Sequence, residues 1–317
     1  MSDEHLRDAL TPPEATEAAA GAGTGPTAGV TAKVAGGSAT AAAAWKRFRR
    51  NRSGLFGLIL VMLLTLVALL APLLAPHDPF RTSRNSFSPP LATEGHPLGT
   101  DHLGRDVLSN VIWGARVSLL VGVAAALTAT LIGVFVGSLS GFFGGWFDEL
   151  LMRFTEFFQI IPRFVLALIV VAFFGSGLLN LILVIGILSW PQTARLVRSQ
   201  YLSHKTLPYV DAGRALGMRS ARLIFVEILP NVMAPVLVVA SLDVAQAILL
   251  EASLGFFGLG DPNLTSWGGM LNTAQSYMQR AWWMSVFPGV CISLAVLGFN
   301  LLGDGLTEAA DPRMSMR

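Results

Sequence analysis

The side chains best suited to metal chemistry in this sequence lie in one proline-rich segment. His96 and His102 stand six positions apart beside Asp101, and imidazole and carboxylate groups are common ligands of transition metals. That spacing matches no specific ligand pattern on a loop, and the sequence offers no firm third ligand beside the pair. We therefore expect no metal site here, although Arg105 and Asp106 follow closely.

Motifs for covalent or nucleotide chemistry are absent from the sequence. None of the three lysines, Lys33, Lys46 and Lys205, follows a glycine, so there is no Gly-x-x-x-x-Gly-Lys-[Ser/Thr] loop to cradle phosphates. Neither His-Glu-x-x-His nor Gly-x-Ser-x-Gly occurs. The net charge of +2 gives no reason to expect a nucleic-acid partner. We expect no catalytic residue and no cofactor held by this chain itself.

Two polar residues interrupt an apolar stretch in the second half of the chain. Asp243 and Gln246 stand in the run VVASLDVAQAILL. Ionisable residues inside apolar spans are costly and are candidates for function. Asp243 could meet a cationic or amino group of a substrate, or it could be a hydrogen-bonded carboxyl packed against a partner. Asp243 and Gln246 are therefore candidate lining residues of a passage, with both roles open for the aspartate.

The polar loop 206–230 is the longest such interruption in the second half. Thr206 can cap a first helix, Pro208 is tolerated in its first turn, Gly217 can end it in a left-handed conformation, and Ser220 can cap the next helix. A short loop between membrane spans has no core of its own. Its apolar surface should therefore be buried in a partner or rest on lipid headgroups. The candidate contact residues of this loop are Asp211, Ala212, Gly213, Arg214, Ala215, Leu216 and Gly217.

The composition predicts the elements that position these groups. Hydrophobic residues make up 53% of the 317 residues and charged residues only 13%, against about 25% charged in soluble domains. We expect an all-α membrane protein. Six stretches are long and apolar enough to span a bilayer: 54–75, 117–142, 154–174, 178–197, 232–250 and 282–303. The third should kink near Pro162.

The distribution of basic residues predicts the topology. Arginine and lysine are roughly three times as frequent on the side shared by both termini, which places both termini in the cytoplasm. The resulting organisation is a disordered cytoplasmic tail (1–44), a basic juxtamembrane segment (45–53), the first span (54–75), an extracytoplasmic loop (76–116), a five-helix core (117–303) and a cytoplasmic C-terminal tail (304–317).

Glycine and tryptophan patterns add two packing expectations. Glycines recur every fourth residue at Gly133, Gly137, Gly141 and Gly145, a stripe that lets another helix approach closely. Gly145, with Gly144, should belong to the turn that follows the span. Tryptophans at 267, 282 and 283 are expected in an interfacial belt.

The loop 206–230 resembles the cytoplasmic coupling loop of ABC-importer permeases. That pattern reads Glu-Ala-Ala, three residues, Gly, nine residues, then Ile-x-Leu-Pro. The residues that fill these places are, in order, Asp211, Ala212, Gly213, Gly217, Leu229 and Pro230. Three departures are mild, because the register stays intact: Asp211 replaces Glu, Gly213 replaces the second Ala and Glu227 replaces Ile.

The resemblance assigns roles to the coupling residues. Asp211 would stabilise the start of a coupling helix or pair with Arg214. Ala212, Gly213, Ala215 and Leu216 would enter a groove of an ATPase. Gly217 would make the turn that follows.

The likeness extends over essentially residues 45–313. The runs HPLGTDHLGRDVLSNVIWGARVSLLVG, ASLGFFGLGDPNLTSWGGML and FNLLGDGLTEAADPR look like those of the C-type permease subunit in the dipeptide, oligopeptide and nickel branch. The resemblance implies a type I importer fold in the inner membrane of a prokaryote. It also implies a second, related permease, two ATPase subunits that bind ATP and magnesium, and an extracytoplasmic substrate-binding protein.

The expected substrate is a dipeptide or oligopeptide. Nickel chelates and glutathione are handled in the same branch and remain alternatives. A self-contained secondary transporter is a further alternative, but it would want coupled carboxylates and an inverted repeat, and only Asp243 is a candidate carboxylate.

Overall fold

The computed structural model describes residues 45–310, which are helical throughout apart from turns, loops and one isolated bridge between Thr100 and Asp106. The expected tail at 1–44 and the last residues, 311–317, lie outside the described part. The elements are α2 (Arg52–Leu69), α3 (Ala71–Leu74), α4 (Val107–Phe143), α5 (Gly145–Ile160), α6 (Arg163–Phe174), α7 (Leu178–His204), α8 (Pro208–Ala215), α9 (Ser220–Arg222), the π-helix η1 (Leu223–Ile228), α10 (Leu229–Phe256), α11 (Trp267–Gln275) and α12 (Trp283–Ala310).

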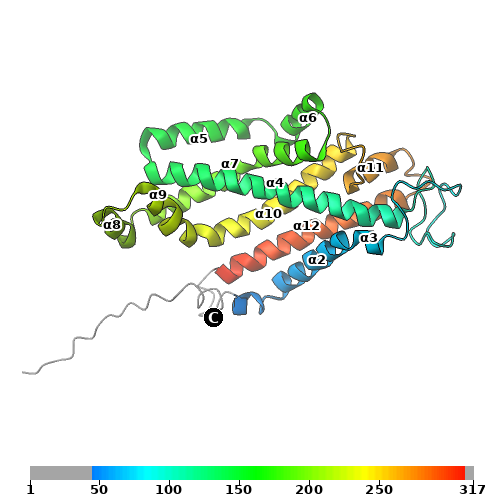
Figure 1. Cartoon of the computed structure of the whole chain (residues 1–317), viewed down its shortest axis with the longest axis horizontal. Helices are drawn as coiled ribbons and strands as arrows, with labels where there is room; N and C mark the ends of the chain where they lie inside the picture. Colours follow the sequence, from blue (N-terminus) through cyan, green and yellow to red (C-terminus); the bar gives the residue numbers. More distant parts are fainter. Residues whose placement is uncertain (1–44, 311–317) are drawn as a thin grey trace, which may run out of the picture. The chain divides into compact units, whose positions relative to one another are not determined.

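The long helices of residues 45–310 lie side by side (Figure 1). Within this part, α4 packs on α7 and α10, and α12 packs on α2 and α10. The short helices α8 and α9 lie at one end, which we call the coupling end. Helix α11 and the loop 75–106 lie at the other, which we call the loop end.

The described residues contain five helices long and apolar enough to cross a membrane, or six if α5 and α6 count as one broken span. This agrees with the six spans expected from the sequence. The two halves of the broken span meet at 83°. Pro162 explains the break, because proline cannot donate the next helical hydrogen bond and disfavours helical geometry at Ile161 before it.

Several element boundaries differ from the sequence expectation, because α5 begins at Gly145, α7 runs to His204 and α10 spans Leu229–Phe256. Helix α4 begins at Val107, so residues 107–116 are helix and not loop, because the Asp106 carboxylate caps the helix by accepting from Ser109 N at 2.8 Å. Helix α12 continues to Ala310, well into the expected C-terminal tail. The first span ends its regular helix at Leu69, shortly before Pro72.

Helices α4 and α7 approach each other closely along the glycine stripe. A Cβ built at Gly133 would stand 2.6 Å from the Thr193 Cβ, and one at Gly141 would stand 2.6 Å from the Tyr201 Cβ. These spacings are below any normal carbon contact, so the two helices touch backbone to backbone here. Gly145 lies beyond the end of α4, as expected, but it is the first residue of α5 and not part of a turn; it has a φ of +60° and open space around it.

The expected tryptophan belt is wrong for two of its three members. Trp267 is fully buried under α4, where its Nε1 donates to the Val111 carbonyl at 3.0 Å. Trp283 is buried too, and its Nε1 donates to the Thr100 carbonyl at 3.1 Å. Only Trp282 is exposed. The indole N–H groups found carbonyl partners inside the loop end, which favours burial over an interfacial position.

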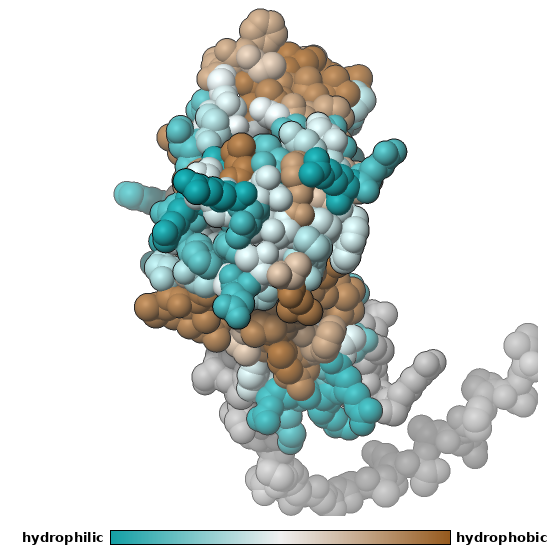
Figure 2. Space-filling model, turned by 90° about the vertical axis from the view of Figure 1, so that its right-hand side faces the viewer, coloured by the Kyte–Doolittle hydropathy of each residue, from teal (hydrophilic) through white to brown (hydrophobic). Residues whose placement is uncertain are grey.

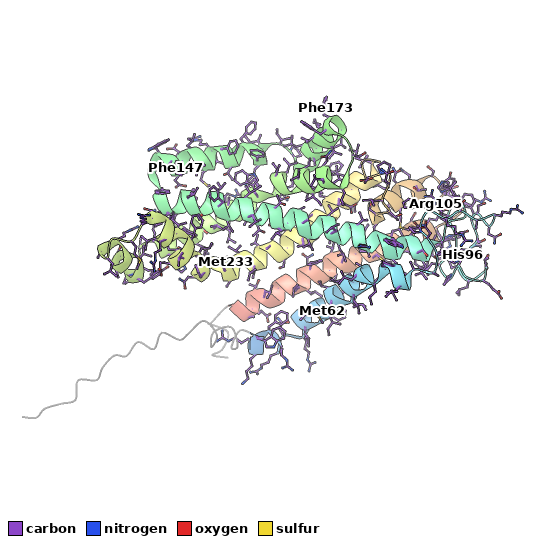
Figure 3. The ribbon with its side chains drawn as sticks, viewed as in Figure 1. Met62, His96, Arg105, Phe147, Phe173 and Met233 are labelled. Carbon is purple, nitrogen blue, oxygen red and sulfur yellow. The ribbon has the colours of Figure 1, made fainter. Side chains whose placement is uncertain are left out.

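The outer surface of residues 45–310 matches a membrane protein. Large apolar side chains are exposed on the helices, among them Met62 of α2 and Phe173 of α6, both labelled in Figure 3. Seen from the loop end, hydrophilic residues gather over the centre, with hydrophobic surface above and below them (Figure 2). Such a surface fits a bundle whose sides face lipid and whose ends face water.

Candidate functional site

The coupling end is built by the segment between α7 and α10. Helix α8 starts with Pro208 at its first position after Leu207, so the expected Thr206 cap is wrong: its hydroxyl donates to the Ser203 carbonyl instead. Gly217 has a φ of +71°, as expected for the residue that ends this helix. Met218 N bonds the Gly213 carbonyl at 3.0 Å, which completes a Schellman motif.

The two faces of α8 have different surroundings. Val210 and Gly213 are buried, and a Cβ at Gly213 would stand 2.7 Å from Leu223 Cδ2. Gly213 therefore packs against its own chain, and its expected contact with a partner's groove stays a prediction. Ala212, Ala215 and Leu216 lie on the open face, where Leu216 is 77% exposed.

The charged residues of α8 pair with each other. Arg214 Nη1 lies 3.2 Å from Asp211 Oδ1, as one of the two expected roles of Asp211 requires. The Arg214 guanidinium also lies 5.8 Å from the centre of the Phe142 ring at the end of α4. Both charged groups are well exposed, so the pair contributes little stability. Its effect is to hold Arg214 toward α4 and leave the small and apolar face open.

A buried cluster connects α8 to the long helices. Tyr201 of α7 is fully buried and its hydroxyl donates to the Ile224 carbonyl at 2.9 Å. Val210 and Ile228 pack in the same cluster, which joins α7, α8, η1 and α10. Tyr209 lies beside His204, with 3.1 Å between its hydroxyl and Nδ1, and burial raises the pKa of this tyrosine, so it stays a neutral hydrogen-bonding group.

An ion pair braces the same end and was not found from the sequence. Nε and Nη2 of Arg198 in α7 each lie 2.6 Å from an oxygen of Asp148 in α5. Ser140 in α4 also donates to Asp148, and Lys205 Nζ donates to the Gly141 carbonyl at 3.0 Å. The partners are fifty residues apart, so no local spacing could have indicated the pair. Three helices are thereby fixed beneath the coupling segment.

The passage candidates lie by an open hollow of about 650 Å³ between α6, α7, α10 and α12. Asp243 is only 4% exposed, and its Oδ2 accepts from the Thr193 hydroxyl at 3.0 Å. Gln246 is exposed and lines the same hollow together with Arg163. The structure thus brings the two candidates to one cavity but gives them different environments, one buried and bonded and one free to meet a solute.

A second carboxyl within α10 was missed by the sequence reasoning. Glu251 is 1% exposed and its Oε2 accepts from the Ser118 hydroxyl at 2.9 Å. Ser118 in turn accepts from Trp267 N at 3.2 Å. Glu251 directly follows the apolar run VVASLDVAQAILL, and this position in the sequence could have indicated a carboxyl inside the helix. Its buried hydrogen bonds tie α4, α10 and α11 together near the loop end.

The histidines weighed as metal ligands have separate environments. His102 stacks on the Tyr277 ring, with centroids 5.1 Å apart. His96 instead lies beside Asp106, with 3.0 Å between Nδ1 and Oδ1. Figure 3 places His96 and Arg105 at the loop end, opposite the coupling end.

Comparison with known proteins identifies the family. Residues 129–316 match the family described as the binding-protein-dependent transport system inner membrane component. Residues 41–90 match the N-terminal TM domain of oligopeptide transport permease C. The Pseudomonas aeruginosa di/tripeptide transport system permease protein DppC is 42% identical over 276 residues, which cover 85% of this chain and 91% of the relative. This chain belongs to that permease family.

Other relatives of the permease are similar over comparable lengths. The oligopeptide transport system permease protein OppC of Bacillus subtilis is 38% identical over 276 residues, covering 85% of this chain and 90% of the relative. The glutathione transport system permease protein GsiD of Pectobacterium atrosepticum is 38% identical over 275 residues, with the same coverage of 85% and 90%. The permease is therefore a multi-pass inner-membrane transport component with the type I importer fold, and not an enzyme. Its family implies ATPase and substrate-binding protein partners.

Proposed function

We propose that this permease forms half of the passage of an importer for dipeptides or oligopeptides, and that α8 couples it to the ATPases. The other half would come from a second, related permease, and two ATPase subunits would dock at the coupling end. The observation that carries the coupling role is the open face of α8, where Ala212, Ala215 and the exposed Leu216 stand on a braced support. The named relatives support the substrate class.

The coupling segment is suited to transmit a rigid-body movement. Tyr201, Val210 and Ile228 join α8 to α7 and α10 through buried contacts. The Asp148–Arg198 pair joins α5 to α7 beside them. A partner that grips α8 would therefore move the helices that line the hollow, because packed interfaces shift between arrangements and do not deform freely.

Both termini and the coupling end are assigned to the cytoplasm, and the loop end to the outside. The clustered arginines near the start of α2 and those around α8 support this, because positive residues are retained on the inner side. The ATP that drives transport is available only in the cytoplasm. The loop end would then receive peptide from the binding protein.

We assign Gln246 to contact with the substrate and Asp243 to the wall of the hollow, where it makes no substrate contact. Gln246 is exposed in the hollow, so its amide can bond a passing peptide. Asp243 is held by Thr193 and almost fully covered, which favours the packed carboxyl over direct contact with an amino group. Glutathione remains a second candidate substrate, because the glutathione permease named above is 38% identical.

A substitution at Gly217 tests the coupling role. Valine at a φ of +71° is strained, since left-handed geometry costs an ordinary residue about 1–2 kcal/mol and a β-branched one more. No atom lies within 4 Å of a Cβ built there, so the change distorts the turn without a clash. In the reconstituted importer, Gly217→Val should leave the permease in the membrane but lower the number of peptides imported per ATP hydrolysed.

The matched control is Gly175→Val. Gly175 also has a positive φ, +90°, and open space around its Cβ position, but it lies between α6 and α7 away from the coupling end. This variant should keep the wild-type ratio of uptake to hydrolysis. A normal ratio in Gly217→Val, or an equal loss in both variants, would show that the coupling assignment is wrong.

A further inference from the structure

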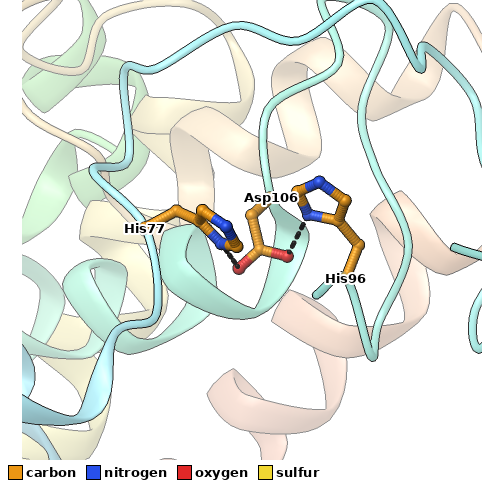
Figure 4. A group of neighbouring side chains, drawn as sticks. All are labelled: His77, His96 and Asp106. Carbon is orange, nitrogen blue, oxygen red and sulfur yellow. Dashed lines mark hydrogen bonds and ion pairs between the residues drawn. The ribbon is translucent and has the colours of Figure 1, made fainter. Parts of the chain in front are cut away.

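Three side chains from separate parts of the loop end converge on one point. His77 follows α3, His96 comes from the middle of the loop 75–106, and Asp106 caps α4. The two imidazoles flank the carboxylate (Figure 4), with 3.0 Å from His96 Nδ1 to Oδ1 and 3.9 Å from His77 Nδ1 to Oδ2. One ligand atom from each residue lies within 4.8 Å of the other two.

The cluster is held in place by its surroundings. Asp106 Oδ2 accepts from both Ser109 N at 2.8 Å and the Ser109 hydroxyl at 2.6 Å. The same hydroxyl accepts from His77 N at 3.1 Å, which fixes the backbone of this histidine. The rings of His77 and His96 stack with centroids 4.8 Å apart. Such outer hydrogen bonds are the kind that orient metal ligands.

One atom of the cluster is left without a partner. His77 Nδ1 is buried and has no hydrogen bond among the described residues, although it points toward Asp106. A buried imidazole nitrogen in this position is costly unless something satisfies it. A cation between the two histidines and the carboxylate would satisfy it and would also neutralise Asp106.

We propose that His77, His96 and Asp106 bind a divalent transition-metal ion of the zinc type. With ligand bonds of about 2.0–2.1 Å, tetrahedral geometry places ligand atoms about 3.3 Å apart. His96 Nδ1 lies 3.0 Å from Oδ1 of Asp106 and His77 Nδ1 lies 3.9 Å from Oδ2, and one ligand atom from each residue lies within 4.8 Å of the other two, so modest side-chain shifts would complete the site. Two imidazoles and one carboxylate favour zinc over calcium or magnesium, which prefer oxygen ligands alone.

A fourth ligand has room beside the cluster. The adjoining cavity of about 160 Å³ is lined by His77, His96 and Asp106 together with Arg81, Thr82 and Ser83. A water molecule occupies about 30 Å³, so a metal-bound water fits there. The sequence expectation of no metal site considered His102 and missed His77, which only the fold brings to His96.

Zinc at this position would join the start of the loop, its middle and the first turn of α4. An ion that binds the folded state alone stabilises it by RT ln(1 + [ion]/Kd), which grows with the ion concentration. The melting temperature of the permease should therefore rise with zinc concentration. Calcium and magnesium should leave it unchanged.

The test is a zinc titration of the full-length permease, purified in detergent with a tag free of histidine. Competition with a chromophoric chelator gives stoichiometry and affinity. We expect one zinc ion per chain, and an affinity at least about tenfold weaker in His77→Ala and in His96→Ala, since each removes one ligand. The matched control is His102→Ala, which removes a loop-end histidine outside the cluster and should bind as the wild type does.

Two results would overturn the proposal. One is the absence of stoichiometric zinc binding by the wild-type chain, a result that needs no variant to fold. The other is binding that His77→Ala leaves unchanged, which would place the ion elsewhere, such as at His5 or His204. Equal binding of calcium would also overturn it, because imidazole ligands disfavour that ion.

Discussion

The contact between α4 and α7 at Gly141 offers a test of how the coupling end is held. In Gly141→Ala the new Cβ would stand 2.6 Å from the Tyr201 Cβ and 2.8 Å from the Arg198 carbonyl oxygen, where ordinary contacts begin at 3.4 Å. The helices must therefore separate locally by about 0.8 Å, the shortfall at Tyr201. Overpacking of this kind costs about 1–3 kcal/mol. It acts on the two residues that brace the coupling segment.

The matched control is Gly289→Ala in α12, where no atom lies within 4 Å of the added Cβ. Alanine is the better helix former by about 1 kcal/mol at both sites, so the difference between the variants isolates the overpacking. Thermal unfolding in detergent, followed by tryptophan fluorescence, should place Gly141→Ala roughly 2–6 °C below the control, at about 2 °C per kcal/mol for a chain of this size. Equal melting temperatures would refute the close approach of α4 and α7.

Three further predictions concern the Asp148–Arg198 ion pair and the hollow lined by Asp243 and Gln246. Arg198→Ala should lower stability by roughly 1–2 kcal/mol in the same unfolding measurement, because Asp148 loses two charged hydrogen bonds at a partly exposed site, and Arg198→Lys should lie between it and the wild type. Asp243→Asn should leave uptake of neutral and cationic peptides unchanged, since an amide oxygen can still accept from Thr193. A selective loss of cationic peptide uptake in this variant would instead assign the Asp243 carboxyl to substrate contact. Gln246→Lys should reduce peptide uptake by the assembled importer.

The features that depend on local sequence could mostly be predicted. The spans follow from apolar length, the end of α8 follows from a glycine that alone tolerates its φ of +71°, and the break of the third span follows from Pro162. The Asp211–Arg214 pair follows from a spacing of three on a helix. Each of these depends on neighbours within a few residues along the chain.

Features that depend on tertiary contacts could not be predicted. Asp148 and Arg198 meet only because the glycine stripe sets α4 and α7 together. His77 reaches Asp106 only through the folded loop. Gly213 fills a place in the family pattern, but the pattern did not show that this side of α8 packs against Leu223. Sequence spacing gives a residue's place on a helix, and the neighbouring elements decide what that place contacts.

The central claim is that the open face of α8 is the surface the ATPases grip, and labelling of a cysteine at position 216 tests it most directly. Leu216→Cys, made together with Cys291→Ser, places the only thiol where the native side chain is 77% exposed. A soluble maleimide should label it rapidly in the isolated permease and slowly once the ATPases are bound. Leu91→Cys at the loop end, where the native side chain is 86% exposed, should label equally in both states. Equal labelling of position 216 with and without the ATPases would contradict the account.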